Sequence, residues 1–154
     1  MKYLPPFFSI DELVGLVVPQ CEELARCAAD QGLALTPELL RLAVRVGVME
    51  PEKIRLLIVP RVPMPRSPEI RSVFTAAGLS LEHLGSITQH HAIIMREGQH
   101  RRSEIWCHEL RHVAHHECFG GTRGFMTVYV QELIHFGYGL GPLEIDAKHA
   151  ELLA

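Results

Sequence analysis

The chain has 154 residues, of which 47% are hydrophobic and 21% are charged, and this composition is typical of a globular protein with a core of its own. The formal net charge of −3 at pH 7 gives no support for a nucleic-acid-binding protein, which would carry a basic surface. No run of residues approaches the roughly 20 apolar positions that a membrane span needs. We therefore expect a single domain over residues 1–154, with an N-terminal helical layer at 1–50 and the functional core at 51–154.

The start of the chain does not resemble a secretory signal. Its apolar stretch Met1–Phe8 is broken by two prolines, and Asp11 and Glu12 follow, whereas a signal peptide needs an unbroken apolar region. The cysteines form no C-x-x-C pair of the kind that holds zinc. We therefore predict a cytoplasmic protein whose four cysteines are free thiols, namely Cys21, Cys27, Cys107 and Cys118.

The first 50 residues carry two helix starts. Ser9–Glu12 is a capping box, with serine at the N-cap and glutamate three residues later. We expect Pro19 to interrupt this helix and a second helical segment to end near Gly32. Thr36–Pro37 predicts another helix, which Gly47 ends. These helices are expected to pack against the core rather than to bind a partner.

The next stretch alternates strands with a loop and a short helix. Ile54–Val59 is apolar and rich in β-branched residues, which predicts a strand. Four prolines make Pro60–Pro68 an extended loop, and Pro68–Ala77 suits a short helix. Ser86–Met95 is expected to form a second strand, followed by a polar turn at Arg96–Arg102. The chain is therefore predicted to have an α+β fold, mostly helical with a small β-sheet.

A helix with an unusual polar face follows that turn. Ser103 is the expected N-cap, and Gly120–Gly121 is a strong stop. Between them the chain reads H-E-x-x-H, with His108 and His112 four residues apart on one helical face. Two imidazoles so placed can hold one Zn²⁺, and Glu109 beside them can take a proton from a water bound to it. The sequence therefore predicts a central helix that carries a zinc site.

Two more helices are predicted after the double glycine. Apolar residues recur at helical spacing over Phe125–Phe136, which favours a helix although Thr127–Val130 alone would suit a strand. Gly137–Gly141 is a glycine-rich loop, and Pro142 starts a last helix that continues to about Leu152.

A catalytic zinc usually has three protein ligands, so a third ligand is needed. Glu144 is the best candidate, because it falls in the first turn of the last helix, and the small Ala147 one turn later lets that helix approach the central one. Three alternatives remain open. Glu132 and His135 share a face of the preceding helix, and Cys118 follows His112 by six residues, where metzincins have a third histidine.

The H-E-x-x-H motif with a downstream E-x-x-A resembles the gluzincin metallopeptidases, most closely the catalytic core of CAAX prenyl proteases and heat-shock membrane proteases. The run His108–Val113, the pair Gly120–Gly121 and the segment Pro142–Glu144 also resemble small bacterial zincin-like proteins. The likeness covers about residues 86–152 and implies a minimal zincin-like fold at 51–154. Lys148 stands where the membrane proteases have aspartate, and their membrane helices are missing, so the likeness does not extend to their substrates.

The resemblance implies a zinc-dependent peptidase that acts on peptide or protein substrates. By this resemblance, His108, His112 and Glu144 of this chain would hold Zn²⁺, and Glu109 would be the general base. The strand at Ile87–Met95 would pair with the substrate backbone. A hydrogen-bond donor for the oxyanion is expected near the third ligand, where Tyr138 is preferred to the alternatives His135 and His149. Two other readings remain: a zinc-stabilised protein-binding module with little or no turnover, and a metal-free helical domain.

Overall fold

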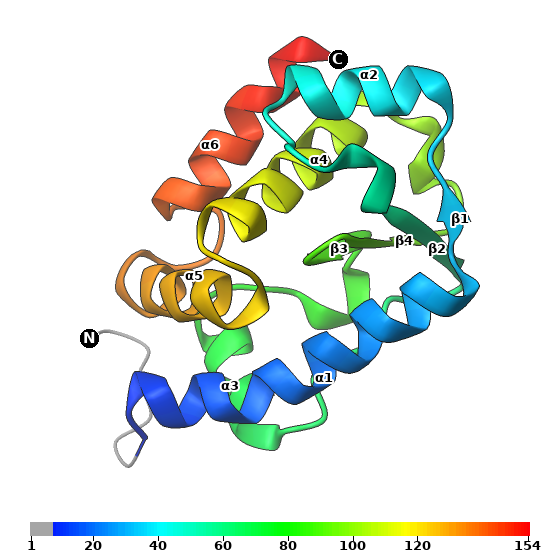
Figure 1. Ribbon diagram of the computed structural model, residues 1–154. Helices are drawn as coiled ribbons and strands as arrows, with labels where there is room; N and C mark the ends of the chain where they lie inside the picture. The colour runs from blue at the N-terminus through cyan, green and yellow to red at the C-terminus, as the bar shows by residue number, and fades with distance from the viewer. Residues whose placement is uncertain (1–7) are drawn as a thin grey trace.

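The computed structural model describes residues 8–154, so the prediction made for the start of the chain lies mostly outside the described part. The fold is α+β as predicted, mostly helical with a small β-sheet (Figure 1). In chain order the helices and strands are α1 Ile10–Gln31, β1 Leu33–Ala34, α2 Pro37–Arg45, β2 Arg55–Val59, α3 Pro68–Ala76, β3 Ser86–Gln89, β4 Ala92–Arg96, α4 Ser103–Cys118, α5 Thr122–Phe136 and α6 Pro142–Ala150. Short 3₁₀ turns occupy Pro51–Lys53, Leu81–His83, Gln99–Arg101 and Glu151–Leu153.

The four strands form one mixed sheet in the order β1-β2-β4-β3. The central pair β2 and β4 is parallel, and the two outer pairs are antiparallel. A parallel pair needs a crossover connection, and the segment that contains α3 supplies it. β3 therefore ends the sheet, and its outer edge has no strand partner among residues 8–154.

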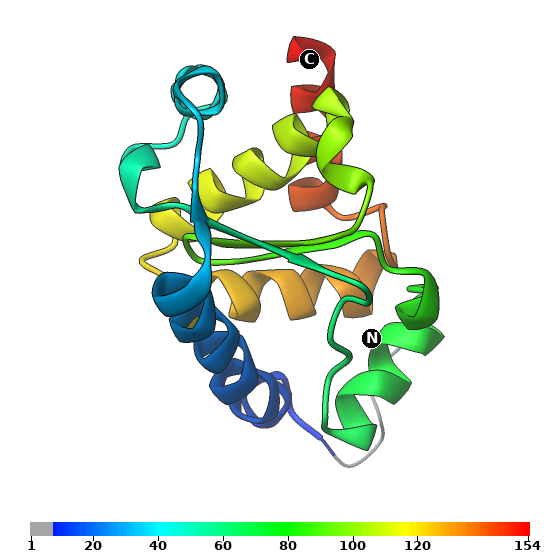
Figure 2. The same ribbon diagram turned by 90° about the vertical axis from the view of Figure 1, so that its right-hand side faces the viewer.

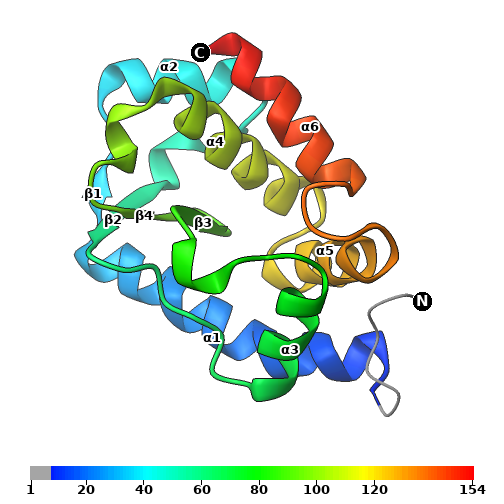
Figure 3. The ribbon, with the colours of Figure 1, turned by 180° about the vertical axis from the view of Figure 1, so that it is seen from behind.

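Helices cover both faces of this sheet. Figure 2 shows the sheet edge-on, with α2, α4 and α6 on one side and α1, α3 and α5 on the other. One cluster of buried residues joins α1, α3 and α5 through side chains such as Leu13, Ile70 and Ile134. A second cluster joins α2 and α4 to the sheet through Ile93 and Leu110. The central helix α4 is therefore fixed between the sheet and α6, as the view from behind also shows (Figure 3).

The capping box at Ser9 is present as the sequence predicts, but Pro19 does not interrupt α1. The Ser9 hydroxyl accepts from the Glu12 backbone N–H while the Glu12 side chain accepts from the Ser9 N–H. A proline inside a helix leaves the carbonyl four residues earlier without its partner. That carbonyl belongs to Gly15, and both Gly15 and Pro19 are exposed, so water can satisfy it. The buried stripe, which includes Val17, keeps the helix whole across this point.

The predicted strand at Ser86–Met95 is two strands. β3 and β4 form a hairpin that turns at His90–His91, and His90 has a φ of 56°. Histidines form the turn, so the sequence lacks the glycine or asparagine that usually marks such a hairpin. Two smaller predictions also need correction. Arg102 rather than Ser103 is the N-cap of α4, and its side chain makes no capping hydrogen bond. The short strand β1 was not predicted from the sequence.

The remaining boundaries agree with the sequence patterns. α5 is a helix over its whole length, and the loop before α6 contains the predicted glycines. The four cysteines are free. Among residues 8–154, no helix has both the length and the apolar character that crossing a membrane requires.

Candidate metal centre

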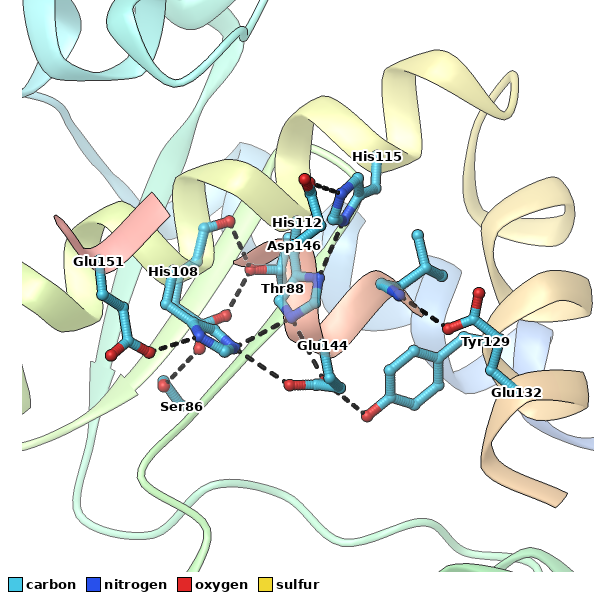
Figure 4. Close-up of polar contacts among 12 residues, drawn as sticks. Ser86, Thr88, His108, His112, His115, Tyr129, Glu132, Glu144, Asp146 and Glu151 are labelled. Carbon is cyan, nitrogen blue, oxygen red and sulfur yellow. Dashed lines mark hydrogen bonds and ion pairs between the residues drawn. The ribbon is translucent and has the colours of Figure 1, made fainter. Parts of the chain in front are cut away.

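Two helices bring three potential metal ligands together. His108 and His112 project from one face of α4, and Glu144 projects toward them from the first turn of α6 (Figure 4). The approach of the helices depends on Ala147, which is fully buried and carries only a methyl group. The Arg111 guanidinium also ties them, because its Nε donates to Asp146 Oδ2 at 2.6 Å.

The donor atoms of these residues have the spacing of a zinc site. The Nε2 atoms of His108 and His112 lie 3.1 Å apart. Glu144 Oε2 lies 3.3 Å from His108 Nε2, and Glu144 Oε1 lies 3.4 Å from His112 Nε2. A tetrahedral zinc ion with ligands at about 2.0–2.1 Å separates its ligand atoms by about 3.3 Å. The geometry and the donor types therefore fit Zn²⁺.

Hydrogen bonds behind both imidazoles orient them for this task. His108 Nδ1 lies 2.9 Å from Glu151 Oε1, and because a carboxylate oxygen only accepts, Nδ1 carries a proton. Similarly, His115 Nε2 donates to Asp146 Oδ2 at 2.7 Å. In neutral His115 the Nδ1 atom is then an acceptor, and it lies 3.3 Å from His112 Nδ1. Both pairs of contacts direct an Nε2 lone pair toward the centre, which is the arrangement found around metal-bound histidines.

Contacts between the histidines and Glu144 stabilise the charged forms of His108 and Glu144. Burial alone would lower the pKa of His108, but the hydrogen bond to Glu144 and the charges of Glu109 and Glu144 outweigh it and raise that pKa to about 9. Burial alone would raise the pKa of Glu144, but the hydrogen bonds to His108 and His112 hold it well below its usual value. Burial lowers the pKa of His115, which keeps this ring neutral. A proton on His108 thus occupies the place that a cation would take.

Glu109 lies beside the cluster and is held by the edge strand. Its two carboxylate oxygens accept from the hydroxyls of Ser86 and Thr88, each at 2.6 Å. Thr88 Oγ1 also lies 3.1 Å from the Glu109 carbonyl oxygen. The residue is 5% exposed, so its carboxylate has a fixed orientation. Each oxygen keeps acceptor capacity, because a carboxylate has about four lone-pair sites.

Two tyrosines border the cluster. The Tyr129 hydroxyl on α5 donates to Glu144 Oε1 at 3.0 Å, so it holds the third candidate ligand in place. Tyr138, the predicted oxyanion donor, stands in the loop before α6 and lines the same cavity as His108 and Glu144. Burial and the charge of Glu144 raise the pKa of Tyr138 to about 12, so its hydroxyl remains a donor at neutral pH.

The alternative third ligands have other positions. Glu132 Oε2 accepts from the Leu143 backbone N–H at 2.8 Å and so anchors the start of α6. His135 is exposed, with its Nδ1 2.8 Å from the Gln131 carbonyl oxygen, and Cys118 is exposed at the end of α4. Within residues 8–154, none of these three joins the cluster formed by the two α4 histidines.

A second group of possible ligands lies at the far end of α4. Glu50, His91 and Glu117 each offer a donor atom within 4.8 Å of the others. Protein groups already satisfy this cluster: Glu117 accepts from the backbone N–H groups of Met49 and Glu50 at 2.6 and 3.0 Å and contacts His91 Nε2 at 2.9 Å. The Lys53 ammonium pairs with Glu50. We interpret this group as a structural tie between the loop after α2 and the hairpin turn.

The residues that support the ligands were not predicted from the sequence. These are Ser86, Thr88, His115, Tyr129, Asp146 and Glu151. His115 and Asp146 had a signal, because His115 lies three residues after His112 and Asp146 two after Glu144, close to the expected ligands. The others depend on tertiary packing.

Comparisons with known proteins do not extend this picture. No model of a known protein family matches the chain, and neither a curated protein nor a solved structure matches it.

Proposed function

We propose that the chain is a zinc-dependent peptidase, with His108, His112 and Glu144 as the metal ligands. The observation that carries this proposal is the convergence of three side chains from two helices. The two imidazole Nε2 atoms lie 3.1 Å apart, and each lies 3.3–3.4 Å from one of the two Glu144 carboxylate oxygens, each imidazole being oriented by a hydrogen bond on its other nitrogen. The presence of a carboxylate beside the ligands favours a catalytic site, because a purely structural zinc site needs no general base.

The protein residues divide the reaction between them. A zinc ion held there would supply a Lewis acid for a substrate carbonyl and lower the pKa of a bound water to about 7. Glu109 takes a proton from the attacking water, whose oxygen bonds to the carbonyl carbon. As the C–N bond breaks, Glu109 returns that proton to the amine, so one water yields a carboxylic acid and an amine.

Other side chains position the reacting groups. The hydroxyls of Ser86 and Thr88 aim the Glu109 carboxylate, and Tyr129 aims Glu144. Tyr138 offers a phenolic hydroxyl to the developing oxyanion. The edge strand β3 adjoins these groups, and its unpaired edge supports the proposal that a peptide substrate binds along it. Four free thiols suit a reducing compartment, and we propose that the protein works in the cytoplasm.

A second function is favoured by one observation about Glu109. Both of its carboxylate oxygens bind hydroxyls of β3, so Glu109 also ties α4 to the sheet. A residue with this structural role would be needed even in a zinc-stabilised protein-binding module with little or no turnover. The two functions share the zinc site and differ in whether Glu109 moves protons.

The test compares wild type with Glu109→Gln, loaded with zinc and given a mixed peptide library. Glutamine keeps the shape and can still contact the two hydroxyls, but it cannot take a proton. The matched control is Glu104→Gln, at the start of the same helix, where the Glu104 side chain is 40% exposed. A peptidase predicts cleavage by wild type and the control, and a loss of at least about 100-fold in Glu109→Gln. No cleavage by any of the three, with zinc bound to each, supports the binding module.

A further inference from the structure

A mostly apolar cavity, called the apolar cavity below, extends from the candidate ligands into the protein. It has a volume of about 120 Å³, and residues of β3, α4 and α1 line it. His108, Glu109 and Glu144 line its α4 side, while Cys21 lines its α1 side. Any group that is bound at the ligand cluster can therefore reach into this space.

The wall of the cavity is predominantly apolar. Aliphatic, aromatic and proline side chains from four separate segments contribute to it, among them Val17, Leu24, Pro63, Phe74, Leu79 and Met126. Burial raises the pKa of the Cys21 thiol to about 12, so this side chain is also uncharged. An apolar cavity of about 150 Å³ engineered into another protein binds benzene. The cavity here therefore suits one apolar side chain of leucine or phenylalanine size.

One polar atom in this wall lacks a partner. The amide oxygen of Gln89 is buried and makes no hydrogen bond within residues 8–154. Its side chain lies next to the Cys21 thiol, on the side of the cavity away from the metal ligands. Buried acceptors are nearly always hydrogen-bonded, and leaving one unpaired is costly. A ligand that carries a donor at its far end would satisfy Gln89.

A wider, more open cleft adjoins the apolar cavity. It has a volume of about 460 Å³ and shares Ser86, His108, Glu109 and Tyr138 with the apolar cavity. The rest of its wall contains polar side chains from the end of β4 and the segment that follows it, among them Gln99. The candidate ligands thus stand where a wide polar cleft meets a narrow apolar one.

We infer that the apolar cavity is the specificity pocket of the site, taking one apolar substrate side chain, and that Gln89 favours a side chain with a hydrogen-bond donor at its tip. This inference rests on the proposed metal site. The substrate backbone lies in the open cleft, and a single side chain enters the cavity beside the ligands. Among the natural side chains, tyrosine has an apolar ring and a terminal hydroxyl, so the site prefers tyrosine to phenylalanine, and both to alanine.

The experiment measures the binding of three hydroxamates to zinc-loaded protein by calorimetry. Acetohydroxamate can bind the metal alone, 3-phenylpropanohydroxamate adds a ring, and its 4-hydroxyphenyl analogue adds a donor. Filling the cavity with the ring should tighten binding on the order of 100-fold. The added hydroxyl should gain about a further fivefold through Gln89.

Two variants and one control locate these effects. Val17→Phe fills the cavity from α1 and should abolish the gain from the ring while leaving acetohydroxamate binding unchanged. Leu16→Phe is the matched control, because Leu16 is a neighbour on the same helix that is 41% exposed and lies outside the cavity. Gln89→Met should remove only the preference for the hydroxyphenyl probe. Unchanged acetohydroxamate binding and a cooperative thermal transition establish that each variant is folded.

The possible failures are distinguishable. If no hydroxamate binds the zinc-loaded protein, the metal site fails and the pocket assignment fails with it. If acetohydroxamate binds but the ring adds nothing, the metal site stands and the pocket assignment is overturned. If Val17→Phe and Leu16→Phe lose the ring effect equally, the ring binds elsewhere, which also overturns it. Equal affinity for both ring probes removes the role of Gln89.

Discussion

The residue that most sharply tests the support of the candidate ligands is Glu151, because its one side-chain hydrogen bond within residues 8–154 is to His108 Nδ1, the imidazole nitrogen that faces away from the other ligands. Its carboxylate lies 2.9 Å from His108 Nδ1, and its side chain is 32% exposed. Removing a hydrogen-bond partner of this kind typically lowers metal affinity by 10–100-fold. Glutamine keeps an oxygen that can accept from His108 Nδ1 but loses the negative charge, so we expect Glu151→Gln to weaken zinc binding by about 10-fold, at the low end of that range.

Zinc affinity is measured by competition with a chromophoric chelator at pH 8 and fixed ionic strength. Glu104→Gln removes the same charge from the exposed start of α4, where Glu104 pairs with Arg102, and should bind zinc as wild type does. An equal loss in both variants would mean that net charge rather than the contact with His108 is responsible. Wild-type affinity in Glu151→Gln would refute the reasoning about this contact.

Two further predictions follow from the same geometry. The apparent zinc affinity should rise about tenfold per pH unit between pH 7 and pH 9, because zinc must displace the proton that His108 holds with a pKa of about 9. An affinity that does not change with pH over this range would contradict the role of His108 as a ligand. Leu110→Ala should lower the free energy of unfolding by about 2–5 kcal/mol in urea titrations, because Leu110 is fully buried between α4 and the sheet. Leu152→Ala, at a position that is 86% exposed, should change it by less than about 0.5 kcal/mol, and equal losses in the two variants would contradict the core assignment.

Local signals in the sequence were sufficient for most of the helices and for the candidate ligands. The cap at Ser9 and the prolines that open α2, α3 and α6 act within one turn, so their effect is visible in a few residues. The spacing of His108 and His112 fixes their common face on any helix. Glu144 is predictable because Pro142 marks where α6 begins and the small Ala147 marks where α6 approaches α4.

The features that were missed depend on contacts between distant segments. Pro19 stays inside a helix because its neighbours on the buried stripe pack against α5 and α3, which outweighs the lost backbone hydrogen bond. The hairpin turn at His90 has no local turn signal. Ser86 and Thr88 reach Glu109 only because β3 ends the sheet beside α4. The sequence predicts one unbroken strand over Ser86–Met95 instead, so it does not place these two residues at the edge of the sheet.

The most direct test of the account is zinc K-edge X-ray absorption on zinc-loaded protein. The account predicts one zinc ion per chain, with nitrogen and oxygen ligands at about 2.0–2.1 Å and multiple-scattering features from two imidazoles. Glu144→Ala should lose one oxygen ligand and bind zinc more weakly. Failure to take up zinc, or a sulfur ligand at about 2.3 Å, would contradict the assignment of His108, His112 and Glu144.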